Sequence, residues 1–192
     1  MKFQAVPLSE AKGKIVGHNI AGPDGKRLLR KGKPLTDEDV EILRGLGRAT
    51  VYVAELEAGD VDENTAARRV AQAICGPGLH ISGASFGRAN LLVDDMGILR
   101  IDVERLAQIN EREGMTLATI TSHFPVHAKQ IVATVKIIPY AVPESSVSEI
   151  ESISSGSNPI VRVDPLRVRS VGLILSGSTS LRARLVQDFF PL

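Results

Sequence analysis

The sequence predicts an α+β protein with a small β-rich N-terminal block, a central mixed β domain with helices, and a terminal strand-turn-helix segment that opens an α/β domain. Three observations predict this class. Short runs rich in β-branched residues alternate with helix starts that carry polar caps. The two strongest strand patterns, at residues 115–121 and 130–138, follow one another with only a bend between them. The last segment joins an apolar run to a glycine turn and an amphipathic run. We expect the domains at residues 1–60, 61–158 and 159–192.

The N-terminal block is predicted to contain short strands around turns, one helix and a closing strand. Residues 22–25 (Gly-Pro-Asp-Gly) have turn chemistry, because proline fixes its own φ and glycine accepts positive φ. Thr36 starts a helix as a hydroxyl cap with Asp39 three residues later, and Gly45 and Gly47 end it. The strands are expected at residues 2–6, 14–20, 27–30 and 50–54.

The central domain is predicted to begin with an acid-capped helix. This helix starts near Asp60 and runs to about Cys75, with Val70 and Ile74 as its i, i+4 core pair, until residues 76–78 (Gly-Pro-Gly) end it. Strands are expected at residues 79–82, 88–93 and 98–101. Residues 94–97 (Asp-Asp-Met-Gly) predict a hairpin connection between the last two of these strands.

The remaining elements are predicted from caps and prolines. Asp102 caps a helix that runs to about Arg112, and residues 123–126 form the bend between the two strongest strands. Pro143 suits the first turn of a helix over residues 144–153. A turn-rich linker at 154–159 and strands at 160–163 and 167–175 follow. The apolar face of the helix after Asp102 is expected to hold Val103, Leu106, Ala107 and Ile109.

Composition argues against several classes of partner. The net charge is +1, which gives no electrostatic reason to expect nucleic acid or an anionic membrane. The local basic cluster is interpreted as a solvated surface rather than a binding patch; it consists of Lys26, Arg27, Arg30, Lys31 and Lys33. The single Cys75 allows no internal disulfide and fits a reducing compartment. Without a signal-peptide core in residues 1–20 or a long apolar run, we expect a cytoplasmic protein.

The candidate catalytic and metal-binding residues of the first 169 positions do not form a recognisable site. Asp94 and Asp95 are adjacent, so their side chains are expected to point apart at a solvated turn. His123 and His127 have the i, i+4 spacing of zinc-binding helices, but Pro125 between them breaks a helix. Nucleophile-elbow, phosphate-loop and dinucleotide motifs are absent from the sequence. We therefore predict no catalytic residues and no metal site here.

His18, His80 and Cys75 are further candidates for functional side chains. His18 and His80 lie in apolar strand contexts, where a hydrogen-bonded structural imidazole is the default interpretation. Cys75 follows a helical stretch, and a catalytic thiol would need a base and an activating charge nearby. We expect all three side chains to be structural.

The strongest candidate site is the turn Ser176-Gly177-Ser178-Thr179-Ser180. It is rich in hydroxyl groups and lies where a strand is expected to meet a helix, which is the favoured ligand position in open α/β sheets. The first N–H groups of a helix, with the helix dipole behind them, bind anions. The turn therefore predicts a phosphate or cofactor site, with a purely structural turn as the alternative.

A family resemblance favours the first interpretation. Residues 171–181 (Val-Gly-Leu-Ile-Leu-Ser-Gly-Ser-Thr-Ser-Leu) resemble the strand and loop that open the molybdopterin-binding domain of molybdenum-cofactor biosynthesis proteins, including the molybdopterin molybdenumtransferases. Segments upstream are similar to the region that precedes this domain in molybdopterin-binding proteins. These are residues 7–18, residues 87–92 (Gly-Arg-Ala-Asn-Leu-Leu), and residues 125–126 leading into 130–139.

The resemblance implies a cytoplasmic molybdopterin-binding protein of which this chain is mainly the N-terminal scaffold region, with the binding domain cut off after Leu192. The phosphate of an anionic pterin would approach residues 176–180. The partners that the resemblance implies are a second copy of the chain, in a homodimer, or a molybdoenzyme. The molybdenumtransferases carry Gly-Asp-Glu in this loop, whereas here Ser178 and Thr179 follow Gly177. Two alternatives therefore stay open, a non-catalytic interaction or dimerisation module serving a molybdoenzyme and a molybdate-inserting transferase.

Overall fold

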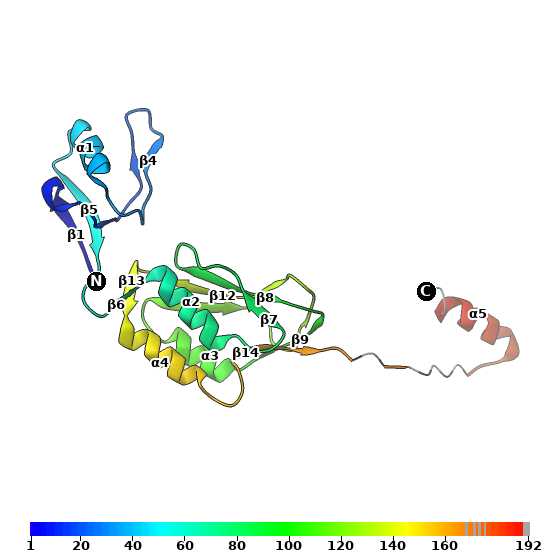
Figure 1. Cartoon of the computed structure of the whole chain (residues 1–192). Helices are drawn as coiled ribbons and strands as arrows, with labels where there is room; N and C mark the ends of the chain where they lie inside the picture. Colours follow the sequence, from blue (N-terminus) through cyan, green and yellow to red (C-terminus); the bar gives the residue numbers. More distant parts are fainter. Residues whose placement is uncertain (168, 171, 173, 175, 190–192) are drawn as a thin grey trace.

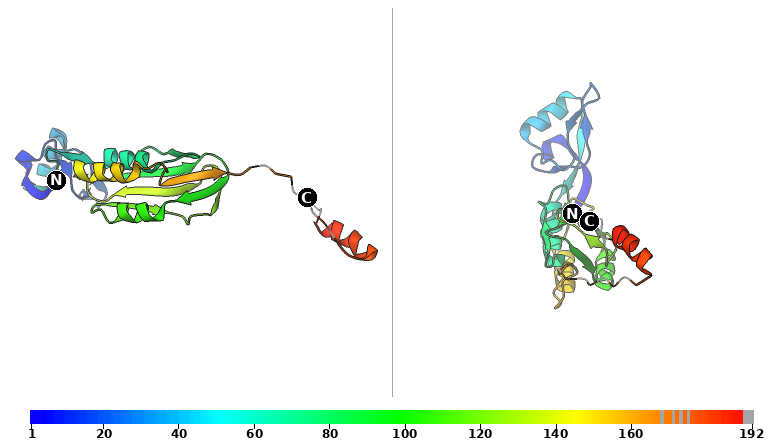
Figure 2. Two further views of the ribbon diagram at one scale, coloured as in Figure 1. Left: turned by 90° about the horizontal axis from the view of Figure 1, so that it is seen from below. Right: turned by 90° about the vertical axis from the view of Figure 1, so that its right-hand side faces the viewer.

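The computed structural model describes residues 1–167, 169–170, 172, 174 and 176–189. The chain has a mixed α+β fold, as the sequence predicts. Figure 1 shows the N-terminal block at one end of the central domain, and Figure 2 shows β14 leaving the central domain at the opposite end. Figure 1 and the left view of Figure 2 show helix α5 (Thr179–Phe189) apart from the central domain. No helix among the described residues is long and apolar enough to cross a membrane.

The N-terminal block is built on a three-stranded antiparallel sheet in the order β1-β5-β2. Its strands are β1 (Lys2–Pro7), β2 (Ile15–Val16) and β5 (Thr50–Glu55), and β3 (Ile20–Ala21) and β4 (Arg27–Leu29) form a separate hairpin. A 3-10 turn η1 (Leu8–Glu10) and helix α1 (Asp37–Gly45) complete it. Thr36 and Asp39 form the expected capping box. Val16, Leu43 and Val53 are fully buried in the core of the block.

The central domain has a four-stranded antiparallel sheet in the order β10-β12-β8-β7. Its helices are α2 (Glu63–Ile74), α3 (Val103–Asn110) and α4 (Glu144–Ser154). A second sheet has the order β11-β9-β14, and β6 pairs with β13. The strands are β6 (Asp60–Asp62), β7 (Leu79–Ile81), β8 (Arg88–Val93), β9 (Gly97–Ile101), β10 (Met115–Thr119), β11 (Pro125–Val126), β12 (Ile131–Ile137), β13 (Ala141–Pro143) and β14 (Val161–Pro165).

One hydrophobic core joins these elements of the central domain. Helix α2 packs on β8, β12 and α4, and α3 packs on β10 and α4. Val70 and Ile74, the predicted core pair of α2, are both fully buried. Leu91 of β8 and Ile137 of β12 are also fully buried in this cluster. Along β8 and most of β12, buried positions alternate with half-buried ones, which gives the sheet one apolar face for packing.

Four sequence predictions are wrong in detail. Residues 60–62 form β6 rather than the first turn of a helix, because β13 offers them a ladder partner and Asp62 then caps α2. Residues 94–97 do not close a hairpin, because β8 pairs with β12 and β7 whereas β9 pairs with β11 and β14. The strand expected at 14–20 is split, because residues 15–16 pair with β5 whereas residues 20–21 pair with β4. Val103 is 62% exposed rather than part of a buried face.

Candidate functional site

Residues 176–180 lie at the start of α5, where the sequence places them. The Ser178 carbonyl oxygen accepts hydrogen bonds from the backbone N–H groups of Leu181 and Arg182, at 3.0 Å each. These bonds make Ser178 the residue from which the helix begins. Ser176, Gly177, Ser178 and Thr179 are exposed. The segment therefore presents hydroxyl groups and a helix N-terminus to solvent.

The strand expected at 167–175, before this turn, lies partly outside the described residues. Residues 168, 171, 173 and 175 lie outside the described residues, and 169, 170, 172 and 174 carry no strand assignment. Ile174 is 93% exposed. Of the predicted strand-turn-helix unit, the described residues thus contain the turn and the helix.

The donor chemistry of residues 176–180 suits a phosphate group. Serine and threonine hydroxyls donate hydrogen bonds to phosphate oxygens, and the positive end of the α5 dipole favours the negative charge. No acidic residue lies in the first turn of α5, so no carboxylate there opposes an anion. These donors fit only the phosphate group of a pterin. Residues 176–179 are exposed to solvent and form no enclosed pocket for the ring system.

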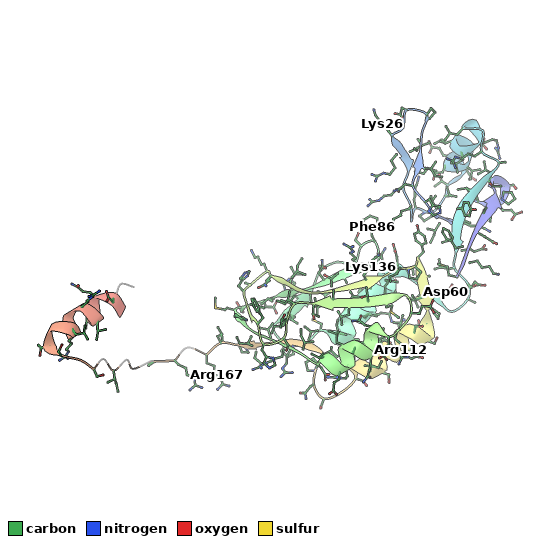
Figure 3. The ribbon with its side chains drawn as sticks, turned by 180° about the vertical axis from the view of Figure 1, so that it is seen from behind. Lys26, Asp60, Phe86, Arg112, Lys136 and Arg167 are labelled. Atoms are coloured by element: carbon green, nitrogen blue, oxygen red, sulfur yellow. The ribbon has the colours of Figure 1, made fainter. Side chains whose placement is uncertain are left out.

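The structure also brings together a cluster that the sequence did not single out, at the contact between the N-terminal block and the central domain. Tyr140 donates its hydroxyl proton to the Gly17 carbonyl oxygen at 2.8 Å, and the Phe3 ring stacks on the Tyr140 ring at 6.4 Å between centroids. The Arg30 guanidinium lies 3.8 Å above the centre of the Phe86 ring. In Figure 3, Phe86 is seen between the two parts, next to Lys136. These contacts attach the N-terminal block to the central domain.

Two charged groups with shifted pKa values lie close to the Gly87 backbone. A Cβ on Gly87 would lie 2.9 Å from both Glu63 Oε2 and Lys136 Nζ, so both head groups converge on the Gly87 backbone. Lys136 Nζ donates to the Phe86 carbonyl oxygen at 2.7 Å, and Asn64 Oδ1 accepts the Gly87 N–H. Burial raises the pKa of Glu63, and burial likewise lowers the pKa of Lys136. Groups of shifted pKa mark functional sites in many proteins, but structural ion clusters shift pKa values as well.

Sequence reasoning missed this cluster because its members are far apart in the chain. Glu63 begins α2, Gly87 precedes β8 and Lys136 lies in β12. One signal was present, since the glycine opens the segment 87–92 that carries part of the family resemblance. Gly87 has a φ of +66°, which accounts for a glycine at this position.

The histidines and the cysteine lie at separate places in the described part of the chain. His80 Nδ1 lies 2.6 Å from Asp94 Oδ1 in an exposed pair. Burial, helped by the Asp94 charge, raises the pKa of the nearby Cys75 thiol, which is the opposite of what an activated nucleophile needs. His123 lies in the bend before β11 with a φ of +66°. No group of three His, Cys, Asp or Glu side chains among the described residues could hold a metal ion.

The basic cluster of the N-terminal block is divided among separate partners. Lys33 Nζ donates to Asp39 Oδ1 at 2.7 Å, and Lys26 lies 4.0 Å from Asp24. Arg30 stacks on Phe86 of the central domain. These side chains therefore serve local contacts and the attachment between the two parts of the chain.

Comparison with known proteins gives one match. Residues 5–55 match a family model described as a domain of unknown function, DUF8806. The match begins within β1 and ends at the last residue of β5, so it covers the sheet and helix of the N-terminal block. No curated protein matches the chain. No solved structure matches it either.

Proposed function

We propose that this chain is mainly the N-terminal scaffold region of a molybdopterin-binding protein that takes part in the biosynthesis or handling of the molybdenum cofactor. In this proposal the phosphate of the pterin approaches Ser176-Gly177-Ser178-Thr179-Ser180. The observation that carries it is the segment itself, because residues that resemble the loop of a molybdopterin-binding domain form a hydroxyl-rich turn that leads into helix α5, with residues 176–179 exposed.

A calorimetric titration of the chain with molybdopterin tests this proposal. We expect heat of binding from the wild-type chain and a loss of affinity of roughly tenfold, about 1.4 kcal/mol, when Ser178, Thr179 and Ser180 are all replaced by alanine. Alanine favours a helix interior, so the changes at Thr179 and Ser180 cost α5 little. The change at Ser178, from which the helix begins, costs about 1 kcal/mol of helix stability, so circular dichroism of the variant must establish that α5 still forms.

Helix α4 supplies a matched control. It has 11 residues, the same length as α5, and exposed serines in its first two turns. Ser145→Ala with Ser148→Ala should leave the affinity unchanged, because Glu144 at that helix start repels an anion. Absence of heat with the wild-type chain, or equal losses in the two variants, would remove the support for the phosphate site.

A second candidate function is a non-catalytic interaction or dimerisation module. It is favoured by the apolar side chains that α5 exposes, since Leu181 is 46% and Val186 43% exposed. Sedimentation equilibrium of the wild-type chain and of Leu181→Ser with Val186→Ser distinguishes this candidate. Self-association that the double variant abolishes would support the module, and a monomer in both cases would count against dimerisation through α5.

A further inference from the structure

A polar cavity of about 330 Å³ lies beside strands β9 and β14, in the central domain. Figure 1 shows these strands at the end of the domain away from the N-terminal block. The cavity is distinct from residues 176–180 and from the Glu63 and Lys136 cluster. Its polar lining includes Arg100, Asp102, Ser122, His123, Arg162 and Asp164.

The strand pattern explains why two arginines share this cavity. Along β14 the buried Val161 and Val163 alternate with the half-buried Arg162 and Asp164. Arg100 of β9 is paired directly with Arg162. Side chains of paired residues lie on the same face of a sheet, so the register places two positive charges side by side.

A single carboxylate lies between the two arginines. Arg100 Nε donates to Asp164 Oδ2 at 2.7 Å, and Arg162 Nε donates to Asp164 Oδ1 at 3.1 Å. Among the described residues, these are the only hydrogen bonds that the two guanidinium groups make, so their terminal Nη groups remain available. Two positive charges face one negative charge, and the imbalance favours an additional anion.

The remaining acid of the cavity is already neutralised. Asp102 accepts the N–H of Arg105 and a 2.9 Å hydrogen bond from Arg105 Nε. Ser122 Oγ accepts the Ile101 N–H at 3.1 Å and keeps its own hydroxyl proton for donation. The cavity thus offers guanidinium and hydroxyl donors without an unpaired carboxylate.

We propose that this cavity binds a phosphate group, either as inorganic phosphate or as the phosphate of a small monoester. Arg100 and Arg162 supply charge-assisted hydrogen bonds from their Nη groups, and Ser122 supplies a neutral one. Asp164 holds the two guanidinium groups in place and at the same time competes with the ligand for them.

Arg69 provides a matched control within the same domain. Its guanidinium lies between two carboxylates, with hydrogen bonds of 2.7 Å to Glu144 and 2.8 Å to Glu151. The ratio of charges is the reverse of that at Arg100 and Arg162. A surface arginine of this kind should not bind phosphate.

The test is a titration of the full chain with inorganic phosphate at low salt, followed by amide chemical shifts. We expect shifts concentrated around Ser122, Arg100 and Arg162, and roughly tenfold weaker binding in Arg162→Gln but not in Arg69→Gln. Asp164→Asn should bind phosphate several-fold more tightly, because it removes the competing charge. A purely structural ion pair predicts no gain in binding from Asp164→Asn.

A parallel titration with a nucleoside monophosphate distinguishes the two sources of the group. Equal affinity for both probes indicates recognition of the phosphate alone, whereas tighter binding of the nucleotide indicates contacts to its organic part. The proposal is overturned if phosphate shifts spread over all exposed arginines, if Arg162→Gln and Arg69→Gln behave alike, or if Asp164→Asn weakens binding in a chain that remains folded. Thermal unfolding of each variant establishes that it is folded.

Discussion

At Gly97 the backbone of β9 passes close to β14, and replacement of this residue by alanine is a sharp test of the central domain. A Cβ at Gly97 would overlap the Val163 side chain and lie 2.5 Å from the Asp164 carbonyl oxygen. Real Cβ atoms essentially never approach a neighbour below 3.0 Å. Because one of the two obstacles is backbone of a paired strand, a rotamer change cannot relieve the overlap.

The expected magnitude follows from overpacking. Adding a methyl group to a well-packed region costs about 1–3 kcal/mol, and a backbone obstacle places Gly97→Ala in the upper half of that range. Each kcal/mol lowers Tm by roughly 4–8 °C for a domain of about 100 residues, so Tm should fall by roughly 10 °C. The pairing of Arg100 with Arg162 depends on the same register of β9 and β14.

Differential scanning calorimetry of Gly97→Ala and Gly83→Ala measures this effect. Gly83 belongs to the same domain, and a Cβ there meets nothing within 4 Å. Its replacement should be neutral or stabilise by about 0.4–1 kcal/mol through the unfolded chain. If the two variants unfold within about 0.5 kcal/mol of one another, the close approach of β9 to β14 is refuted.

Three further predictions concern other parts of the fold. Tyr140→Phe removes the hydrogen bond to Gly17 and should cost about 1 kcal/mol, seen as faster proteolysis between the N-terminal block and the central domain; an unchanged rate would contradict it. Leu43→Ala empties a fully buried site and should destabilise the N-terminal block by about 3 kcal/mol in denaturant unfolding, whereas a loss below about 1 kcal/mol would contradict its place in the core. Asp102→Ala removes the cap of α3 and should cost about 1 kcal/mol at pH 7. The Arg105 backbone N–H and guanidinium lower the pKa of Asp102, so its contribution is present above pH of about 4 and is lost as the pH falls further; a difference from wild type that persists in acid would be evidence against this cause.

Local sequence signals predicted most elements of the fold. The Thr36 capping box, the glycine turn at 22–25 and the strands expected at 115–121 and 130–138 depend on nearby residues, and the structure confirms each of them, the strands as β10 and β12. The hairpin predicted at 94–97 is wrong, because strand pairing depends on residues that are far apart in the chain. Nothing in Asp94 or Gly97 alone shows that β8 and β9 belong to different sheets.

The candidate sites also differ in whether neighbouring residues in the sequence can predict them. The turn at residues 176–180 could be predicted because its hydroxyls and the following helix are contiguous in sequence. The pair of arginines could not, since Arg100 and Arg162 become neighbours only through the register of β9 and β14. Glu63 and Lys136 likewise meet through the packing of α2 on β12 and the backbone of Gly87.

Amide hydrogen exchange with and without molybdopterin tests the proposed function most directly, because it reports where a ligand binds as well as whether it binds. The proposal predicts protection of the amides at residues 177–182, where the turn leads into α5, and little change in β8, β12 or α2. Protection confined to the central domain, or none at molybdopterin concentrations that saturate binding, would contradict the assignment of the phosphate to Ser176-Gly177-Ser178-Thr179-Ser180.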